Sequence, residues 1–258
     1  MNSTINNKEI YIFDVDGTLT PSREGMDPKF ASFFNEFVKN REVYLASGSD
    51  LGKIQEQLTE ETLMSVAGVF TCMGNVFHQY GKKIYQNEFK EPKELRKDLK
   101  SLLFKSKFPL RYGNHIEDRV GMINYSIPGR NISIEQRKQY VQYDKENNER
   151  ILLTSYLNNK YEGKIEASVG GEISIDIINP GKDKSQVISF LKDNELINVD
   201  TFINFYGDRV EHGGNDFALA HAIRLSAHDS NIISVNCWQD TYDKLMFMRQ
   251  EQTNFNIH

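Results

Sequence analysis

The chain of 258 residues has few cysteines, no long apolar run and no excess of positive charge. Its only cysteines, Cys72 and Cys237, lie far apart without the paired spacing of a zinc site, so we expect two reduced thiols. No stretch approaches the roughly eighteen apolar residues of a membrane helix, and the N-terminal residues lack a signal-peptide pattern. The net charge of −5 argues against broad nucleic-acid affinity. We therefore expect a cytoplasmic protein with no membrane or nucleic-acid partner.

The composition is otherwise that of an ordinary globular protein, with 39% hydrophobic and 26% charged residues. The chain is long enough for one large α/β domain or for two domains, and its pattern favours two. Residues 9–81 alternate short apolar strands with helical patterns, the order of a doubly wound parallel sheet. The expected strands there are 9–13, 43–46 and 66–71, and the expected helices are 27–39 and 51–58.

From about residue 82 the pattern changes. Two longer helices are expected at 92–105 and 134–157, among antiparallel strands at 121–127, 164–169 and 172–178. The last two strands are joined by Gly170 and Gly171, a signal for a tight hairpin. After residue 181 the α/β order returns, with helices at 185–191 and 216–223 and strands at 201–206 and 232–235. We therefore predict a catalytic core of residues 1–81 and 181–258, interrupted by an α+β cap of residues 82–180 built on an antiparallel sheet.

Two carboxylates follow the first predicted strand. Asp14 and Asp16 lie two residues apart, and side chains at i and i+2 of an extended segment point the same way. Open α/β folds bind their ligands at the carboxyl ends of the strands. Like charges this close need a cation, a shared proton or different roles. The alternative is an ordinary Asp-Gly turn.

Three further polar segments follow predicted strand ends. The loop 46–50, Ala-Ser-Gly-Ser-Asp, can bind an anion through N–H groups and a hydroxyl, or can simply cap a helix. The segment 181–184 has two lysines before a helix, where charged residues are usually solvated. The segment 207–216 has Asp208 at a strand end and Asp216 at a helix start, with glycines between them that allow tight turns.

Together these segments supply the groups that phosphoryl transfer needs at one sheet edge. Carboxylate oxygens suit Mg²⁺, while lysine and serine neutralise and hold phosphoryl oxygens. One carboxylate can then attack phosphorus while the other moves a proton. The residues alone therefore predict a phosphoryl-transfer enzyme.

Six stretches carry a resemblance to a known family. They are Phe-Asp-Val-Asp-Gly-Thr-Leu-Thr-Pro-x-Arg (13–23), Gly-Ser-Asp-x-x-Lys-Ile-Gln-Glu-Gln-Leu (48–58), Ile-Glu-x-Arg-x-Gly-Met-Ile-Asn (116–124), Gly-Arg-x-x-Ser-x-Glu-x-Arg (129–137), Gly-Gly-x-Ile-Ser-x-Asp (170–176) and Gly-Asp-x-x-x-x-Gly-Gly-Asn-Asp (207–216). In this order they resemble the eukaryotic-type phosphomannomutases of the haloacid dehalogenase superfamily, over about residues 9–245. The resemblance implies a haloacid dehalogenase-like core with an inserted cap.

In the core, the resemblance implies a nucleophile and a metal site. Asp14 would become an aspartyl phosphate, and Asp16 would be the general acid and base toward the sugar hydroxyl. Mg²⁺ would be held by Asp14, the main-chain carbonyl of Asp16 and Asp208. Asp216 would lie in or just behind that group of ligands.

The resemblance also implies the core residues that contact phosphate. Lys184, rather than Lys182, matches the lysine of the family. Ser49 matches the serine that follows two glycines in the family, whereas Ser47 matches the position of the phosphate-binding hydroxyl in other branches of the superfamily. Both serines stay candidates.

In the cap, the resemblance implies a second phosphate site. Arg119, Arg130 and Arg137 match arginines that bind the distal phosphate of a hexose phosphate. Guanidinium groups bind phosphate bidentately where lysine cannot, although a single surface arginine is more often a solvated charge. The other implied substrate contacts are a core arginine, Arg23, and three residues near the sugar and phosphate, Asn124, Ser174 and Asp176.

The reaction implied by the resemblance is the interconversion of mannose 6-phosphate and mannose 1-phosphate, in GDP-mannose biosynthesis. It would proceed through the aspartyl phosphate and a hexose 1,6-bisphosphate, which also serves as activator. Closure of the cap would exclude water. A homodimer formed through the cap is also implied.

Two departures and two alternatives accompany this interpretation. Asp118 replaces an aromatic residue of the family and is expected to bring a negative charge beside Arg119. The segment 217–223 replaces acidic residues that the family links to an accessory cation.

A sugar-phosphate phosphatase of the same superfamily would share the core motifs, but it has less need of a second phosphate site. A catalytically silent binding module is disfavoured because the acids and Lys184 are all present.

Overall fold

The computed structural model describes residues 8–22, 24–226 and 229–255, which form two compact units. The core unit contains the described residues up to Tyr85, then Lys184–Glu211 and those from Asp216 onward. The cap unit contains Gln86–Asp183 and His212–Asn215. Across the described residues, no helix combines the length and the apolar character needed to cross a bilayer.

The core unit is built on a sheet with the strand order β11-β10-β1-β2-β3-β4-β5. The bounds are Glu9–Phe13 (β1), Glu42–Ala46 (β2), Gly68–Thr71 (β3), Val76–Gln79 (β4), Lys82–Gln86 (β5), Phe202–Gly207 (β10) and Ser230–Ser234 (β11). The pairs from β11 to β3 are parallel, whereas β4 runs antiparallel to β3. The order reverses beside β1, since the chain continues to β2 on one side and later returns to β10 on the other. Such a switch point is where doubly wound sheets bind ligands.

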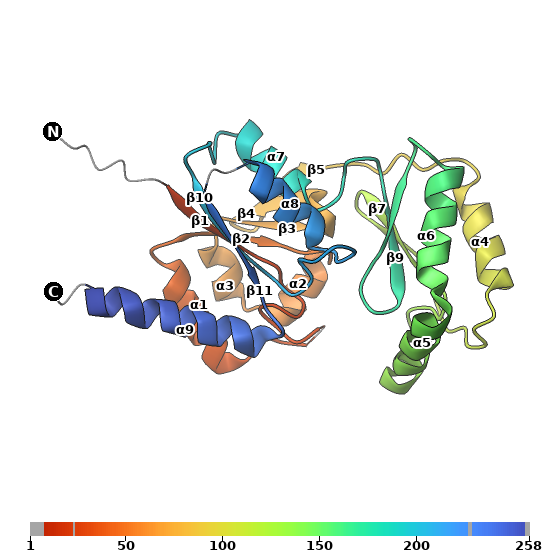
Figure 1. The fold of residues 1–258 in the computed structure, drawn as a ribbon, viewed down its shortest axis with the longest axis horizontal. Coiled ribbons are helices and arrows are strands. Elements are labelled where there is room, and N and C mark those ends of the chain that lie inside the picture. Colours follow the sequence, from red (N-terminus) through yellow and green to blue (C-terminus); the bar gives the residue numbers. More distant parts are fainter. Residues whose placement is uncertain (1–7, 23, 227–228, 256–258) are drawn as a thin grey trace. The chain divides into compact units, whose positions relative to one another are not determined.

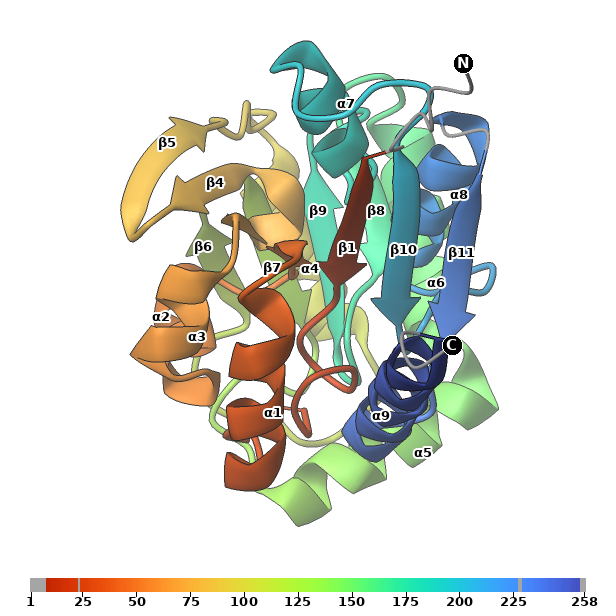
Figure 2. The ribbon, with the colours of Figure 1, turned by 90° about the vertical axis from the view of Figure 1, so that its left-hand side faces the viewer.

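Helices cover both faces of this sheet, as the apolar strand sequences predict. Tyr11 and Phe13 pack toward α1 and α9, while Ile10 and Ile12 pack toward α7 and α8. Figures 1 and 2 show these two layers of helices. The helix bounds are Pro28–Val38 (α1), Leu51–Gln57 (α2), Glu60–Ser65 (α3), Gln186–Asp193 (α7), Phe217–Ser226 (α8) and Trp238–Phe255 (α9), with a short 3₁₀ helix at Cys72–Gly74.

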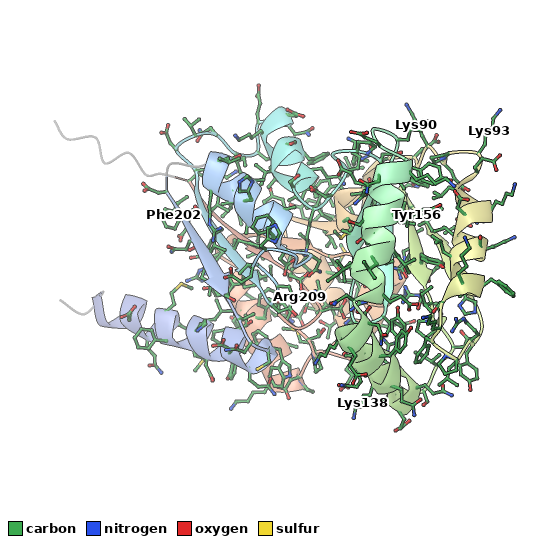
Figure 3. The ribbon with its side chains drawn as sticks, turned by 45° about the vertical axis from the view of Figure 1, so that its right-hand side comes forward. Lys90, Lys93, Lys138, Tyr156, Phe202 and Arg209 are labelled. Atoms are coloured by element: carbon green, nitrogen blue, oxygen red, sulfur yellow. The ribbon has the colours of Figure 1, made fainter. Side chains whose placement is uncertain are left out.

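The cap unit has a four-stranded antiparallel sheet in the order β6-β7-β9-β8. The strands are Ile116–Arg119 (β6), Met122–Ser126 (β7), Glu166–Val169 (β8) and Ser174–Ile178 (β9), and the helices are Leu95–Lys105 (α4), Ile134–Asn147 (α5) and Glu149–Lys160 (α6). Figure 3 labels Lys138 on α5 and Tyr156 on α6. Ile123, Tyr125, Ile175 and Ile177 lie fully or almost fully buried in the cap core with residues of the helices. The alternate residues of β7 and β9 therefore form a second face, which carries the polar Asn124, Ser126, Ser174 and Asp176 beside Met122 and Ile178 and is called the polar face below.

The predicted single helix at 134–157 is wrong. The structure has two helices there, and Asn148 between them is left-handed with φ 52°. Asparagine tolerates this conformation better than most residues, so the Asn-Asn pair at this point ends one helix and begins the next. The sequence patterns also missed α3, α9 and the strands β4, β5 and β6. The predicted hairpin at Gly170 is confirmed by the antiparallel pairing of β8 and β9.

Candidate active site

Three carboxylates and one lysine meet at the switch point of the core sheet. Asp14 follows β1, Asp208 follows β10, and Asp216 precedes α8. Carboxylate oxygens of these three residues lie within 4.8 Å of one another. The Nζ atom of Lys184, just before α7, donates to Asp14 Oδ1 at 2.6 Å and to Asp216 Oδ1 at 2.5 Å. Four segments far apart in the sequence thus bring their charged groups together.

Burial strongly affects the charges of this group. Lys184 and Asp216 are fully buried, and Asp14 is 2% exposed. Burial and the neighbouring Asp216 raise the pKa of Asp14 well above its usual range, and the same two causes raise that of Asp208 to about 7. Burial alone would lower the pKa of Lys184, but the carboxylates of Asp14 and Asp216 outweigh it and raise the pKa. Three acids with one lysine leave an excess of negative charge that a cation would neutralise.

The oxygen atoms of this group suit a hard cation such as Mg²⁺. Asp14 Oδ2 is buried and has no hydrogen-bond partner, and such an orphaned oxygen is costly unless something binds it. Carboxylate oxygens are the ligands that Mg²⁺ prefers. The residues present therefore fit the metal site that the resemblance implies.

Two glycines allow the carboxylates to come this close. Gly17 has φ +87°, and a Cβ atom there would lie 2.6 Å from Asp208 Oδ2. A Cβ atom at Gly207 would lie 2.8 Å from Asp216 Oδ2. The carbonyl of Val15 accepts from the N–H groups of residues 18–20, so the Asp-Gly segment is also a turn. This turn is part of the site, because only a glycine at position 17 leaves room for the side chain of Asp208.

The carboxylate of Asp16 is held by different residues from that of Asp14. Ser49 Oγ donates to Asp16 Oδ2 at 3.2 Å, and Gln57 Nε2 donates to Asp16 Oδ1 at 2.9 Å. The same Gln57 nitrogen lies 3.1 Å from Thr20 Oγ1. The structure thus joins two predicted site residues, Asp16 and Ser49. It adds Gln57, which lies in the quoted stretch 48–58 but has no local pattern that singles it out.

The loop of Ser47 and Ser49 is supported by a turn after β3. Ser47 Oγ accepts from the N–H group of Ser49 at 3.0 Å. The carbonyls of Ser49 and Ser47 accept from the N–H groups of Cys72 and Met73 at 2.8 and 3.0 Å. Cys72 and Met73 have φ 50° and 61°, which is rare for residues with side chains. The side chain of Gln186 in α7 donates to the carbonyl of Met73 at 2.8 Å and so stabilises this turn.

Most of the predicted cap residues lie on the polar face of the cap sheet. Glu117, Asn124 and Asp176 are register partners on β6, β7 and β9, so their side chains point the same way. Arg119, two residues after Glu117, and Arg130 in the loop after β7 both donate to the carboxylate of Glu117. Glu117 is not among the residues predicted from the sequence, although the stretch 116–124 contains it.

Asn124 and Asp176 form a buried polar pair. Asn124 Nδ2 donates to Asp176 Oδ1 at 2.5 Å, and Asn124 Oδ1 is buried with no hydrogen-bond partner. Burial raises the pKa of Asp176, while Arg119 opposes this effect. The predicted Ser174 is also buried on this strand, and a Cβ atom at Gly170 would lie 3.0 Å from its Oγ.

The other predicted cap residues are placed differently. Arg137 lies on α5 and donates to Glu172 at 3.3 Å, so it has its own acidic partner. Asp118 pairs with Arg96 of α4. The expectation that Asp118 adds a negative charge beside Arg119 is wrong, because residues one apart on a strand point to opposite faces. The predicted Arg23 lies outside the described residues.

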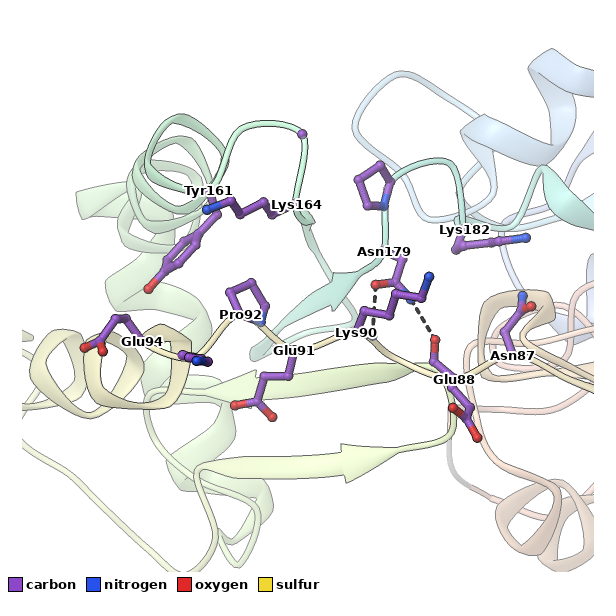
Figure 4. A pocket seen from close by; sticks show the side chains of 13 residues that line it. Asn87, Glu88, Lys90, Glu91, Pro92, Glu94, Tyr161, Lys164, Asn179 and Lys182 are labelled. Atoms are coloured by element: carbon purple, nitrogen blue, oxygen red, sulfur yellow. Dashed lines mark hydrogen bonds between the residues drawn. The ribbon is translucent and has the colours of Figure 1, made fainter.

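A separate pocket of about 870 Å³ lies where the two ends of the cap segment come together (Figure 4). The side chain of Asn179 joins these ends, since it accepts from the N–H group of Lys90 at 3.1 Å and donates to the carbonyl of Glu88 at 2.8 Å. Four lysines and three glutamates line the pocket, so it carries little net charge. The lining includes none of the predicted site residues.

Comparison with known proteins decides the family. A family model described as eukaryotic phosphomannomutase matches residues 30–249. The chain belongs to this family. Proteins named phosphomannomutase from Dendrobium officinale and Spinacia oleracea are each 35% identical to it, over 226 and 227 residues. These alignments cover 85% of this chain and 87% and 89% of the two relatives.

Solved structures confirm the predicted fold class. A haloacid dehalogenase-like hydrolase from Bacteroides thetaiotaomicron has a TM-score of 0.59 at 14% identity, covering 93% of this chain and 99% of that one. The C-terminal domain of a C. albicans trehalose-6-phosphate phosphatase has a TM-score of 0.57 at 16% identity, covering 85% and 74%. At such identities the likeness concerns the fold.

The family match begins at Phe30, so it leaves out the segment with Asp14 and Asp16. The structure supplies that link, because Lys184 within the matched range binds Asp14 directly. The segment 217–223 forms the start of α8, whose first turn has no acidic residue and whose Leu219, Ala220 and Ile223 pack into the core.

Proposed function

We propose that the protein is a phosphomannomutase that interconverts mannose 6-phosphate and mannose 1-phosphate. The observation that carries this proposal is the bond from Lys184 to Asp14 beside two further acids, in a chain of the phosphomannomutase family. The cap arginines support a substrate with a second phosphate position. A homodimer and a role in GDP-mannose biosynthesis remain predictions of the resemblance, and a cytoplasmic location remains a prediction of the sequence.

In the proposed reaction Asp14 is the nucleophile. One of its carboxylate oxygens forms a bond to phosphorus of a hexose 1,6-bisphosphate while the bond from phosphorus to the sugar oxygen breaks. Lys184 holds Asp14 in place and offsets negative charge at the phosphoryl group. After the sugar monophosphate turns over, its other hydroxyl attacks phosphorus and the bond from phosphorus to Asp14 breaks, which regenerates a bisphosphate.

Asp16 carries the proton in this proposal. It gives a proton to the sugar oxygen that leaves phosphorus and takes it from the hydroxyl that attacks. Ser49 and Gln57 hold one carboxylate oxygen each, so they orient the group for this exchange. Mg²⁺, held by Asp14, Asp208 and Asp216 with the main-chain carbonyl of Asp16, would stabilise charge on the phosphoryl oxygens.

The test is an isomerisation assay with mannose 1-phosphate. We expect mannose 6-phosphate to form in the presence of Mg²⁺ and to form much faster when a hexose 1,6-bisphosphate is added. Asp14→Asn should abolish the reaction because the amide cannot accept the phosphoryl group. Rapid release of inorganic phosphate without any isomer would instead support a phosphatase. Isomerisation that persists in the Asp14 variant would refute the assigned nucleophile.

A further inference from the structure

The carboxylate of Glu117 lies between two arginines of the cap sheet. Its Oε2 atom accepts from Nε and Nη2 of Arg119 at 3.1 and 2.7 Å, and from the same atoms of Arg130 at 3.0 and 2.7 Å. The arginine side chains are only 9% and 12% exposed, and that of Glu117 is 27% exposed. A single acidic oxygen therefore fixes the position of both guanidinium groups.

The backbone brings these three residues together in two ways. Glu117 and Arg119 are two apart on β6, so both project from the polar face. Arg130 reaches the same place because the chain turns closely at Gly129, which has φ +90°. A Cβ atom at Gly129 would lie 1.9 Å from the carbonyl oxygen of Tyr112, so only glycine permits this approach.

Electrostatics explains why a carboxylate is needed at this position. Burial lowers the pKa of Arg130, and the neighbouring charge of Arg119 lowers it further, which means that the two cations oppose each other. The negative charge of Glu117 offsets that repulsion, and the carboxyl group of Asp176 adds to this effect more weakly. The arginines can then stay side by side, although they are nearly buried.

We propose that Glu117 is a positioning residue for substrate binding, because it holds Arg119 and Arg130 in the arrangement that receives the distal phosphate of the hexose phosphate. The inference rests on the proposed function, which assigns the phosphate to these arginines. Side chains that are ordered before the ligand arrives reduce the loss of freedom on binding. Glu117 thus contributes to affinity without contacting the phosphate.

The substitution Glu117→Gln distinguishes positioning from simple charge. A carboxylate near a phosphate repels it, so by Coulomb attraction alone its removal should tighten binding. Loss of positioning has the opposite effect. We expect the dissociation constant for mannose 6-phosphate, measured by calorimetry, to rise about tenfold, which corresponds to about 1.4 kcal/mol. The KM of the isomerisation should rise similarly, and kcat should change less than KM.

Two further variants complete the experiment. Glu117→Asp keeps the charge but is one methylene shorter, so it should also weaken binding, and it serves if the glutamine variant does not fold. Glu162→Gln makes the same charge change at an exposed position of the cap unit with no ion pair among the described residues. It should leave the dissociation constant unchanged. Circular dichroism checks that each variant is folded.

Unchanged or tighter binding in Glu117→Gln would overturn the positioning role. The mutase proposal is tested separately in the same samples, through isomerisation by the unaltered protein. If that protein binds mannose 6-phosphate but forms no isomer, the mutase proposal fails. Weakened binding in Glu117→Gln would even then support the positioning role.

Discussion

At the scale of single residues, the two candidate sites depend on charges that are buried and balanced by neighbours. Lys184 is fully buried between Asp14 and Asp216. Replacing it by methionine keeps a similar volume but leaves the two carboxylates without their cation. Removing one partner of a buried ion pair costs about 3–5 kcal/mol, so Lys184→Met should unfold at a clearly lower temperature in calorimetry with EDTA.

The comparison variant for this prediction is Lys192→Met, which removes an exposed lysine from α7. Its free energy of unfolding should stay within about 0.5 kcal/mol of the unaltered protein. Mg²⁺ should raise the unfolding temperature of the Lys184 variant more than that of the unaltered protein, since the ion supplies the lost charge. Equal unfolding temperatures for the two lysine variants would contradict the buried network.

Glu117 gives a prediction for acid stability. Burial alone would raise its pKa, but Arg119 and Arg130 outweigh this effect and lower it to about 2, from an ordinary value of 4.5. A pKa that is lower in the folded state adds stability that is complete above the ordinary value and is lost as pH falls toward 2. As the pH falls from 5.5 to 2.5, the unaltered protein should therefore lose about 1–2 kcal/mol of its free energy of unfolding relative to Glu117→Gln. Urea denaturation at both pH values measures this difference. A constant difference across this interval would show that Glu117 does not titrate in this way.

At the scale of elements, the break between α5 and α6 depends on one exposed residue. Asn148 has φ 52°, and its N–H group donates to the carbonyl of Asp144 at 2.7 Å. Alanine strains this left-handed conformation, whereas glycine adopts it freely. Asn148→Ala should therefore lower the free energy of unfolding by about 1 kcal/mol relative to Asn148→Gly, as measured by urea denaturation.

The neighbouring Asn147 provides the matched substitution for this prediction. It is the last residue of α5 and is exposed. Because alanine is a good helix former, Asn147→Ala should be neutral or slightly stabilising. A similar loss at both positions would mean that the left-handed turn is not what makes Asn148 special.

At the scale of the whole molecule, local patterns predicted the elements whose sequence and surroundings agree. The continuous apolar run of β1 is buried on both faces, and α1 begins where Asp27 accepts from the N–H groups of Lys29 and Phe30. The edge strand β5 could not be found in this way, because its residues are mostly exposed and show no apolar alternation. The direction of Asp118 depends on which face of β6 is polar, and that is fixed only by pairing with β7.

The same limit explains which site residues could be predicted. Asp14, Asp208 and Asp216 each stand at the end of an element, where a spacing pattern reveals them. Glu117 joins Arg119 to Arg130, which lies 13 residues away, and Gln57 acts on Asp16, which lies 41 residues away. No local spacing marks such contacts, since they depend on loop geometry and on helix placement. Sequence thus predicted the chemical groups at the core sheet edge, whereas the structure was needed for the residues that hold them.

The proposed reaction uses both units, and this gives a test for the whole molecule. Lysine at position 130 keeps the charge but cannot form the paired bonds of a guanidinium group. We expect Arg130→Lys to lower isomerisation of mannose 1-phosphate about tenfold or more, because a charge-assisted bond contributes about 1.5–3 kcal/mol. The release of inorganic phosphate from hexose 1,6-bisphosphate, in which water accepts the phosphoryl group, should slow less than the isomerisation. The ratio of released phosphate to isomer should therefore rise. Arg96→Lys, at the arginine that pairs with Asp118, should leave this ratio unchanged. Equal loss of both products in Arg130→Lys would mean that the cap arginine does not direct the phosphoryl group to the sugar.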